Sequence, residues 1–509
     1  MKRILVLIIL FVSLATSAQD EVFYHVFQRS FFDSNDDGHG DLKGINLKLD
    51  YLQELGINTI LLTPLYASDF YHNYFAYDFE KIDPKYGSMD DYQMLVREVH
   101  RRGMKIYQDV EMQYVAGNHP WFTDSYNNPK SKYAKYPYYF DAENKQPWWF
   151  WGITDFTMYN GEHKQIITVN LNNPEVKEYT LNVLKFWVDP NKDGKFDDGV
   201  DGFRLDHMMD NLDSANKLTN LFEGFWTPLL KNLKSVNPKL KIVAEQANWF
   251  AWPNEYFSKG NVDYTFAFKL KYAIGTFKKD LIEKYADSTF TLTPKGKNQL
   301  VFIENHDTSR FASEKGMTGM KSQAAVAIQL LIGGLPSLYY GQEIGMKGEQ
   351  RHMGNTDGND IPIREAFDWY ASGEGKGMAN WYKDTGEWWT KRNQQPNDGI
   401  SLEEEKKDPN SLWNFYREIL KIRKMHPALQ VGKYQPATNA NASVFSFFRV
   451  SGKEKYLIAV NLSENIQQFT FPLAGKKFVP LYGRADYETG KRNLEAAIGS
   501  YETVIFKVE

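Results

Sequence analysis

Short apolar runs alternate with amphipathic stretches along residues 21–424, and this alternation limits the fold more than any other feature of the chain. Such runs are typical of buried parallel strands, and the longer stretches repeat their apolar residues with a helical period. Eight alternations of this kind predict an α/β fold with a (β/α)₈ TIM barrel. The expected strands are residues 22–27, 59–62, 105–110, 202–205, 241–244, 264–268, 300–303 and 336–340. The expected helices are residues 47–55, 89–102, 176–188, 214–235, 321–332 and 412–424.

Two segments depart from this alternation and predict further domains. Residues 115–168 are rich in Tyr, Trp, Asn and Pro and are too long for a plain barrel loop, so we expect a small domain inserted after the third strand. From residue 425 to 509 short alternating runs predict a C-terminal antiparallel β-sandwich. The barrel would then comprise residues 19–114 and 169–424. An open doubly wound sheet is the competing fold, but no Gly-rich dinucleotide fingerprint follows the first strand.

Residues 1–18 predict an export signal. Lys2 and Arg3 precede an apolar run over residues 4–14, and the small residues 16–18 offer a cleavage site. An uncleaved membrane anchor is the alternative, but the run is short for a bilayer span. We therefore expect a periplasmic or secreted protein without stable membrane insertion.

Composition narrows the choice of partners. The net charge is −4 and no basic block stands out, which argues against nucleic acid. The chain contains no cysteine, so an exported form would need another means of stabilising its loops, such as a bound metal ion. Aromatic residues make up 15% of the chain, which suits stacking on sugar rings and also suits a large core. The oligomeric state stays open.

Three acidic residues end or closely follow expected strands: Asp206, Glu245 and Asp307. The carboxyl ends of barrel strands meet at one mouth, so these acids would converge there. Glycoside hydrolysis uses a carboxylate nucleophile and a second carboxyl group that donates a proton. The layout therefore favours that reaction.

Several motifs, spread along the chain in a fixed order, resemble the α-amylase superfamily of glycoside hydrolases. They are residues 32–42, Tyr74, Asp109, residues 202–207, 244–245, 305–307 and 334–343. The resemblance extends from Phe23 to the C-terminus. It implies a retaining, two-step mechanism with Asp206 as nucleophile, Glu245 as acid and base, and Asp307 as the group that holds the distorted sugar.

The resemblance also implies a set of substrate contacts. Arg204 would keep Asp206 ionised, since a nearby cation lowers the pKa of a carboxyl group, whereas Glu245 should have a raised pKa. A purely structural Arg204–Asp206 ion pair is the simpler alternative. The residues expected to contact the substrate are Tyr74, Asp109, Tyr114, Arg204, His207 and His306.

The chain departs from the family pattern at several positions. After Asp109 the family usually has Asn-His, whereas this chain has Gln113 and Tyr114. Asn170 stands where many relatives carry Asp, so the usual calcium site of the family is in doubt. Phe75 replaces an Asp that grips the terminal sugar in exo-acting relatives, which weakens the case for an α-glucosidase.

Two loops place oxygen-bearing side chains at alternate positions around a glycine, as in the first half of an EF-hand. The ligands expected in the first loop are Asp33, Asn35, Asp37 and Asp41, with the main-chain carbonyl of His39. Those expected in the second are Asp189, Asn191, Asp193 and Asp198, with the carbonyl of Lys195. We expect structural Ca²⁺, with Mg²⁺ as the second choice at the first loop. An Asx-rich turn without metal is the alternative.

The resulting hypothesis is an exported retaining hydrolase that cleaves α-1,4-glucosidic bonds in starch or maltooligosaccharides. A transglycosylase or α-glucosidase of the same family is the first alternative. The same covalent intermediate can react with water or with a sugar acceptor. A sugar-binding relative without turnover is the alternative of another class. The sequence leaves linkage, chain length and endo or exo action open.

Overall fold

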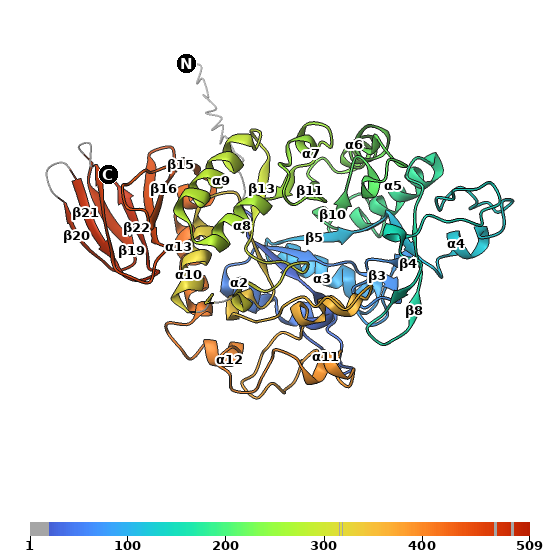
Figure 1. The fold of residues 1–509 in the computed structure, drawn as a ribbon, viewed down its shortest axis with the longest axis horizontal. Coiled ribbons are helices and arrows are strands. Elements are labelled where there is room, and N and C mark those ends of the chain that lie inside the picture. Colours follow the sequence, from blue (N-terminus) through green and yellow to red (C-terminus); the bar gives the residue numbers. More distant parts are fainter. Residues whose placement is uncertain (1–19, 315, 318, 473–475, 490–492) are drawn as a thin grey trace, which may run out of the picture.

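The computed structural model describes residues 20–509 except 315, 318, 473–475 and 490–492, so the expected export signal lies outside the described residues. A closed barrel of eight parallel strands forms the centre of the molecule, as expected (Figure 1). Its strands, in spatial order, are β1 (Phe23–Val26), β14 (Leu335–Tyr339), β13 (Asn298–Val301), β12 (Tyr264–Phe266), β11 (Lys241–Gln246), β10 (Gly202–Met208), β5 (Lys105–Val110) and β2 (Thr59–Leu62).

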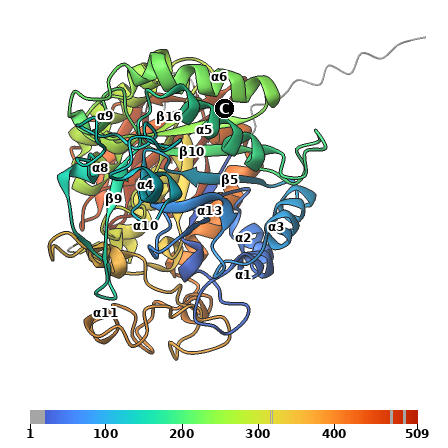
Figure 2. The ribbon, with the colours of Figure 1, turned by 90° about the vertical axis from the view of Figure 1, so that its right-hand side faces the viewer.

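Helices lie around the strands (Figures 1 and 2). They include α1 (Leu42–Leu47), α2 (Leu49–Leu55), α3 (Met89–Arg101), α5 (Pro174–Val188), α6 (Thr227–Val236), α8 (Phe268–Thr276), α9 (Lys279–Leu292), α10 (Met320–Leu331) and α13 (Leu412–Met425). α3 illustrates why these segments are helical: Ser88 and Asp91 form a capping box, and Leu95 and Val99 are buried on one face.

The prediction of a helix over residues 214–235 is wrong at its start. The helical segment begins at residue 221 and leads through a π-turn, Phe222–Trp226, into α6. Ser214, Asn216 and Asn220 have φ between 52° and 57°, in the left-handed region, so no right-handed helix can run through them. α8 and α9 were not expected.

Large apolar side chains fill the barrel interior. Phe23, Tyr107, Val243 and Leu300 belong to one buried cluster that draws on strands from around the barrel. The barrel is therefore a packed core, and a pocket can open only at one of its ends.

The segment between β5 and α5 forms short antiparallel pairs. β6 (Tyr114–Ala116) pairs with β9 (Ile166–Thr168), and β7 (Phe156–Thr157) pairs with β8 (His163–Lys164). α4 (Pro120–Ser125) lies at the end of the molecule opposite the C-terminal sheets (Figure 1).

The segment between β14 and α13 is mostly irregular and includes η7 (Asp357–Ile363), α11 (Glu387–Thr390) and α12 (Leu402–Glu405). Trp381 in this segment is buried and stacks on Tyr71 with ring centres 4.7 Å apart. Trp381 thus packs the segment against the loop region that follows β2, which we call the second barrel loop.

The C-terminal domain consists of two antiparallel sheets, as expected. The sheets have the strand orders β15-β16-β17-β22-β19 and β18-β21-β20. Successive residues of β17 face opposite ways: Ile458 belongs to the core shared with the barrel, and Leu457 to the core between the two sheets. The strands are β15 (Lys433–Pro436), β16 (Val444–Ser451), β17 (Glu454–Asn461), β18 (Gln467–Pro472), β19 (Phe478–Tyr482), β20 (Ala485–Thr489), β21 (Asn493–Ile498) and β22 (Thr503–Val508).

None of the helices in the described part of the chain is both long and apolar enough to cross a bilayer.

Candidate active site

A pocket lies at the carboxyl ends of the barrel strands. Asp206 is near the end of β10, Glu245 is in β11, and Asp307 follows β13. All three acids line the same cavity of about 320 Å³, at the lower end of the ~300–1,000 Å³ typical of small-molecule sites. Tyr74 and Phe75 from the second barrel loop also line it. The structure thus brings the three acids of the sequence hypothesis together.

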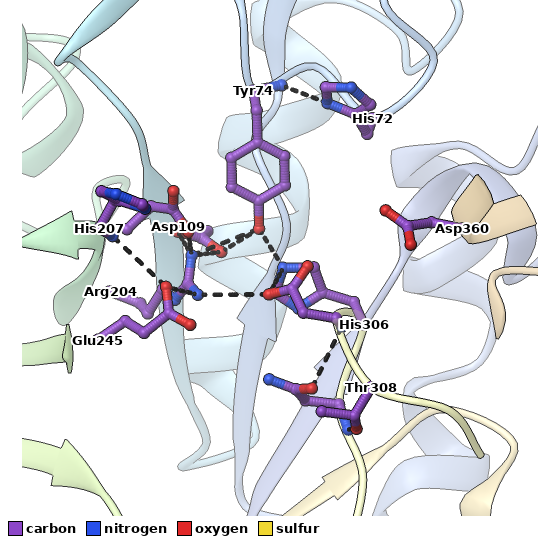
Figure 3. Close-up of polar contacts among 12 residues, drawn as sticks. His72, Tyr74, Asp109, Arg204, His207, Glu245, His306, Thr308 and Asp360 are labelled. Carbon is purple, nitrogen blue, oxygen red and sulfur yellow. Dashed lines mark hydrogen bonds and ion pairs between the residues drawn. The ribbon is translucent and has the colours of Figure 1, made fainter. Parts of the chain in front are cut away.

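Arg204 joins the acidic residues. Its side chain is fully buried, and its Nη1 lies 2.9 Å from Asp109 Oδ2 and also contacts Asp206. Its Nη2 lies 2.8 Å from Glu245 Oε2 and 3.9 Å from Asp307 Oδ2. In Figure 3 the Arg204 guanidinium lies beside Asp109 and Glu245. One cation therefore contacts or approaches four carboxyl groups from four barrel strands or the loops that follow them.

The two carboxyl groups expected to do the chemistry have opposite pKa shifts. Burial alone would raise the pKa of Asp206, but the charge of Arg204 and a hydrogen bond from Glu111 lower that pKa below its usual value. Burial raises the pKa of Glu245 well above its usual range, although Arg204 opposes this shift. The lowered pKa suits Asp206 to the role of a carboxylate, and the raised pKa suits Glu245 to that of a proton donor.

His306 and Arg364 hold Asp307. His306 Nε2 lies 3.0 Å from Asp307 Oδ2, and Arg364 Nη2 lies 3.2 Å from Asp307 Oδ1. Burial, together with the nearby charge of Arg204, lowers the pKa of His306 well below its usual value, so the imidazole is neutral. Arg364 also pairs with Asp360 at 3.1 Å.

Tyr74 lines the pocket, and its hydroxyl group is hydrogen-bonded within the protein. The hydroxyl donates to Asp109 Oδ2 at 2.7 Å and lies 2.5 Å from His306 Nε2. Its ring is parallel to the His306 ring within 9°. Burial raises the pKa of Asp109 to about 7, despite its contact with Arg204.

Tyr114 and His207 also line the pocket and meet at Asp213. The Tyr114 hydroxyl donates to Asp213, and His207 Nε2 lies 3.5 Å from the same carboxyl group. The Tyr114 hydroxyl is therefore already paired within the protein. Of the six expected substrate-contact residues, three line the pocket and three contact residues that line it: Tyr74, Tyr114 and His207 in the first group, and Asp109, Arg204 and His306 in the second.

The sequence hypothesis missed several groups in this pocket. Trp249 Nε1 donates to Glu245 Oε1 at 3.2 Å, and Asp360, Arg364 and Glu111 line the cavity. Only Glu111 had a recognisable signal, because it lies two residues after Asp109, and alternate strand residues share a face. Asp360 and Arg364 come from an irregular segment, where no periodic pattern points to the pocket.

The first predicted metal loop is held by its own side chains. Asp33 accepts main-chain N–H bonds from Asn35 at 3.0 Å, from Asp36 at 2.8 Å and from Gly38 at 2.7 Å. Asp41 caps α1 by accepting from Gly44 N at 2.6 Å. An ionised carboxylate has about four acceptor positions, so Asp33 keeps the capacity to bind a cation.

The remaining first-loop residues lie nearer the surface. Asn35 accepts from the main-chain N–H of Asp37 at 3.1 Å, and the Asp37 carboxylate lies 3.3 Å from Lys85 Nζ. His39 Nδ1 lies 2.9 Å from Arg29, which leaves its main-chain carbonyl as the expected ligand atom.

The second loop has a similar hydrogen-bond pattern. Asp189 and Asn191 both accept from the main-chain N–H of Asp193, at 3.1 and 2.8 Å, and Asp193 accepts from Lys195 N at 2.9 Å. Asp198 is fully buried, and its Oδ1 has no hydrogen-bond partner among the described residues. A buried carboxylate oxygen left unpaired is costly, so this atom fits a cation ligand.

In the described part of the chain no three His, Asp or Glu side chains are grouped so that they could hold a metal ion. Either loop would therefore need the Asn side chain and main-chain carbonyl oxygens as further ligands. Calcium and magnesium accept such oxygen ligands.

A closed parallel barrel with two carboxyl groups of opposite pKa shift in one pocket defines this protein as an enzyme of the glycosidase class. The chain belongs to the α-amylase family of glycoside hydrolases. The family model for the alpha amylase catalytic domain matches residues 25–432, and that for the maltogenic amylase C-terminal domain matches residues 436–505.

The similar proteins are enzymes of this family. Alpha-amylase 3 of Dictyoglomus thermophilum is 31% identical, over 96% of this chain and 93% of that protein. The trehalose synthase/amylase of Mycobacterium tuberculosis is 29% identical, over 89% of this chain and 82% of that protein. The crystal structure of alpha-amylase from H. orenii has a TM-score of 0.79 at 27% identity and covers 96% of this chain and 99% of that one.

Proposed function

We propose that this protein is an exported retaining hydrolase that cleaves α-1,4-glucosidic bonds in starch or maltooligosaccharides. The observation that supports this most is the pocket in which Arg204 contacts both Asp206, whose pKa is lowered, and Glu245, whose pKa is raised. The similarity to alpha-amylase 3 over most of both chains supports the choice of α-glucans as substrates.

The proposed reaction has two steps. Asp206 attacks the anomeric carbon while the glycosidic C–O bond breaks and Glu245 gives its proton to the departing oxygen. Glu245 then takes a proton from water, and the water oxygen displaces Asp206 from the sugar. Because Arg204 contacts both groups, it stabilises Asp206 before the attack and Glu245 after it has lost its proton.

The other pocket residues would bind and orient the sugar. Asp307, held by His306 and Arg364, would bind sugar hydroxyl groups through charge-assisted hydrogen bonds. The ring of Tyr74 gives a flat apolar face on which a sugar can stack.

We further propose that the two acidic loops bind structural calcium. Asp33 in the first loop and the unpaired Asp198 oxygen in the second support this proposal. Export is proposed from Lys2, Arg3 and the apolar run that follows them.

Transglycosylation is the second candidate function. The same glycosyl-enzyme can pass its sugar to another sugar instead of water. The trehalose synthase/amylase among the similar proteins favours this candidate. A sugar-binding protein without turnover would not need all three acids, and all three are present and grouped.

Incubation with maltoheptaose, followed by product analysis, tests the proposal. We expect new reducing ends with the wild type and almost none with Glu245→Gln. Longer oligosaccharides without net new reducing ends would favour the transferase. Equal signals from wild type and variant would contradict both enzymatic candidates.

A further inference from the structure

Glu111 is an additional carboxyl group in the pocket to which the proposed reaction gives no role. It follows β5 directly, is only 2% exposed, and lines the cavity together with Asp206, Glu245 and Asp307. A buried carboxyl group next to a catalytic one is costly unless it is hydrogen-bonded. Its position therefore calls for a specific partner.

That partner is Asp206. Both side chains line the same cavity, and a hydrogen bond between them lowers the pKa of Asp206 and raises that of Glu111. Two carboxylates repel each other, so such a bond needs one proton between them. Arg204 contacts Asp206 and stabilises its charge. The proton therefore resides on Glu111, which is the donor.

Gln113 holds the main chain at the same point. Its side-chain amide donates to the carbonyl oxygen of Asp206 at 2.6 Å and to that of His207 at 3.2 Å. Its own main-chain N–H donates to Glu111 Oε1 at 2.8 Å. Residues 111–113 thus contact both the side chain and the backbone of Asp206.

The backbone at this point needs such support. His207 has φ of 49°, in the left-handed region, and the register between β10 and β11 shifts between Leu205 and Met208. A non-glycine residue in this conformation is strained and persists only where its surroundings hold it. Asp206 lies directly before it, so its orientation depends on these contacts.

We propose that Glu111 is a positioning residue that acts as a neutral hydrogen-bond donor to Asp206 and, together with Gln113, fixes the orientation of this carboxylate. The inference rests on the proposed role of Asp206 as nucleophile. It assigns Glu111 no proton transfer to substrate or water. The donor keeps Asp206 ionised and aligned, and Arg204 does the same from the other side.

The surroundings of Glu111 support its neutral state. The titratable groups around it are Asp206 and His207 on β10, Asp213 in the loop that follows, and Tyr114 on β6, and Arg204 lies beyond Asp206. Burial, followed by the charge of Asp206, raises the pKa of Glu111 well above its usual range.

Two substitutions of Glu111, neither of which can ionise, test whether Asp206 needs a hydrogen-bond donor at this position. Glu111→Gln keeps a donor for Asp206 and an acceptor for Gln113 N–H, so we expect kcat on maltoheptaose within about threefold of the wild type. Glu111→Ala removes the donor, so kcat should fall about 10- to 100-fold with little change in KM. The acidic limb of the kcat/KM profile should then move up by about one pH unit, since Asp206 becomes easier to protonate.

Equal losses in both variants would overturn the proposal, as would an alanine variant with normal kcat and an unchanged acidic limb. Melting temperatures identify a variant that is merely unfolded, and Glu111→Gln remains informative in that case. Glu343→Gln is a matched control, because Glu343 is also a buried, hydrogen-bonded glutamate but lies outside the pocket.

An infrared difference spectrum between wild type and Glu111→Gln gives a readout that needs no substrate. At pH 7 we expect the C=O band of one protonated carboxylic acid to be lost. Carboxylate bands in its place would overturn the proposal. If this band is present but maltoheptaose is not cleaved, the proposed function fails while the Glu111–Asp206 hydrogen bond stands.

Discussion

The Arg204 guanidinium lies 2.8 Å from Glu245, and its other terminal nitrogen contacts Asp206. One positive charge cannot balance every buried carboxyl group around it, and burial favours the neutral form of those left over. Burial raises the pKa of Glu245 well above the usual range, although the charge of Arg204 lowers it. This relationship leads to predictions for both residues.

Glu245→Gln should remove the proton donor and lower kcat on maltoheptaose by about 10²- to 10⁴-fold. The loss should be smaller on a 4-nitrophenyl α-glycoside, because nitrophenolate leaves without a proton. Wild-type activity should fall as pH rises through the raised pKa of Glu245, since only the acid form donates. Profiles of kcat/KM against pH check this, and equal losses on both substrates would contradict it.

Asp206→Asn should lower kcat by about 10³-fold or more, because the neutral amide cannot form the glycosyl-enzyme. The change is nearly isosteric, so the melting temperature should change little. Asp280→Asn, at an exposed position of α9, is the control and should retain full activity. Near-normal turnover by Asp206→Asn would exclude Asp206 as the nucleophile.

Glu343 should make the protein less stable as pH rises. It accepts hydrogen bonds from Tyr24 and Tyr51, and burial raises its pKa to about 7. A folded-state pKa above the unfolded value of ~4.3 means that this contribution is complete at low pH and is lost as pH rises through about 7.

Glu343→Gln keeps the acceptor oxygen but cannot titrate. Urea unfolding at pH 5 and pH 8 should therefore show a smaller loss of stability in the variant, by up to about 1.4 kcal/mol per pH unit between these pKa values. The same loss in both proteins would mean that Glu343 does not contribute to the pH dependence.

Removal of metal should lower the melting temperature, because an ion that binds only the folded state stabilises it. Stabilisation is about 2.7 kcal/mol at an ion concentration of 100 Kd. Asp33→Asn and Asp198→Asn distinguish the loops, since the variant that lacks the relevant site should lose its response to EDTA. An unchanged melting curve, with no metal found by elemental analysis, would count against both sites.

Local patterns in the sequence were sufficient for the barrel. The expected strands at residues 59–62 and 105–110 coincide with β2 and β5, because strands buried on both faces are rich in apolar residues. The prediction of a helix from residue 214 was wrong for a local reason, because amphipathic periodicity does not reveal left-handed backbone conformations. Three residues in left-handed conformations delay the helical segment until residue 221.

The sequence by itself determined which acids stand at strand ends, because parallel strands bring their carboxyl ends to one mouth. Only the tertiary structure decided which groups touch there. Gln113 reaches the carbonyl of Asp206 across 93 positions in sequence, and the Tyr114 hydroxyl turns to Asp213 across 99. Strand register and loop packing set such contacts, and both depend on the whole barrel being closed. For the same reason the position of Glu111 in the same pocket as Asp206 became visible only in the folded chain.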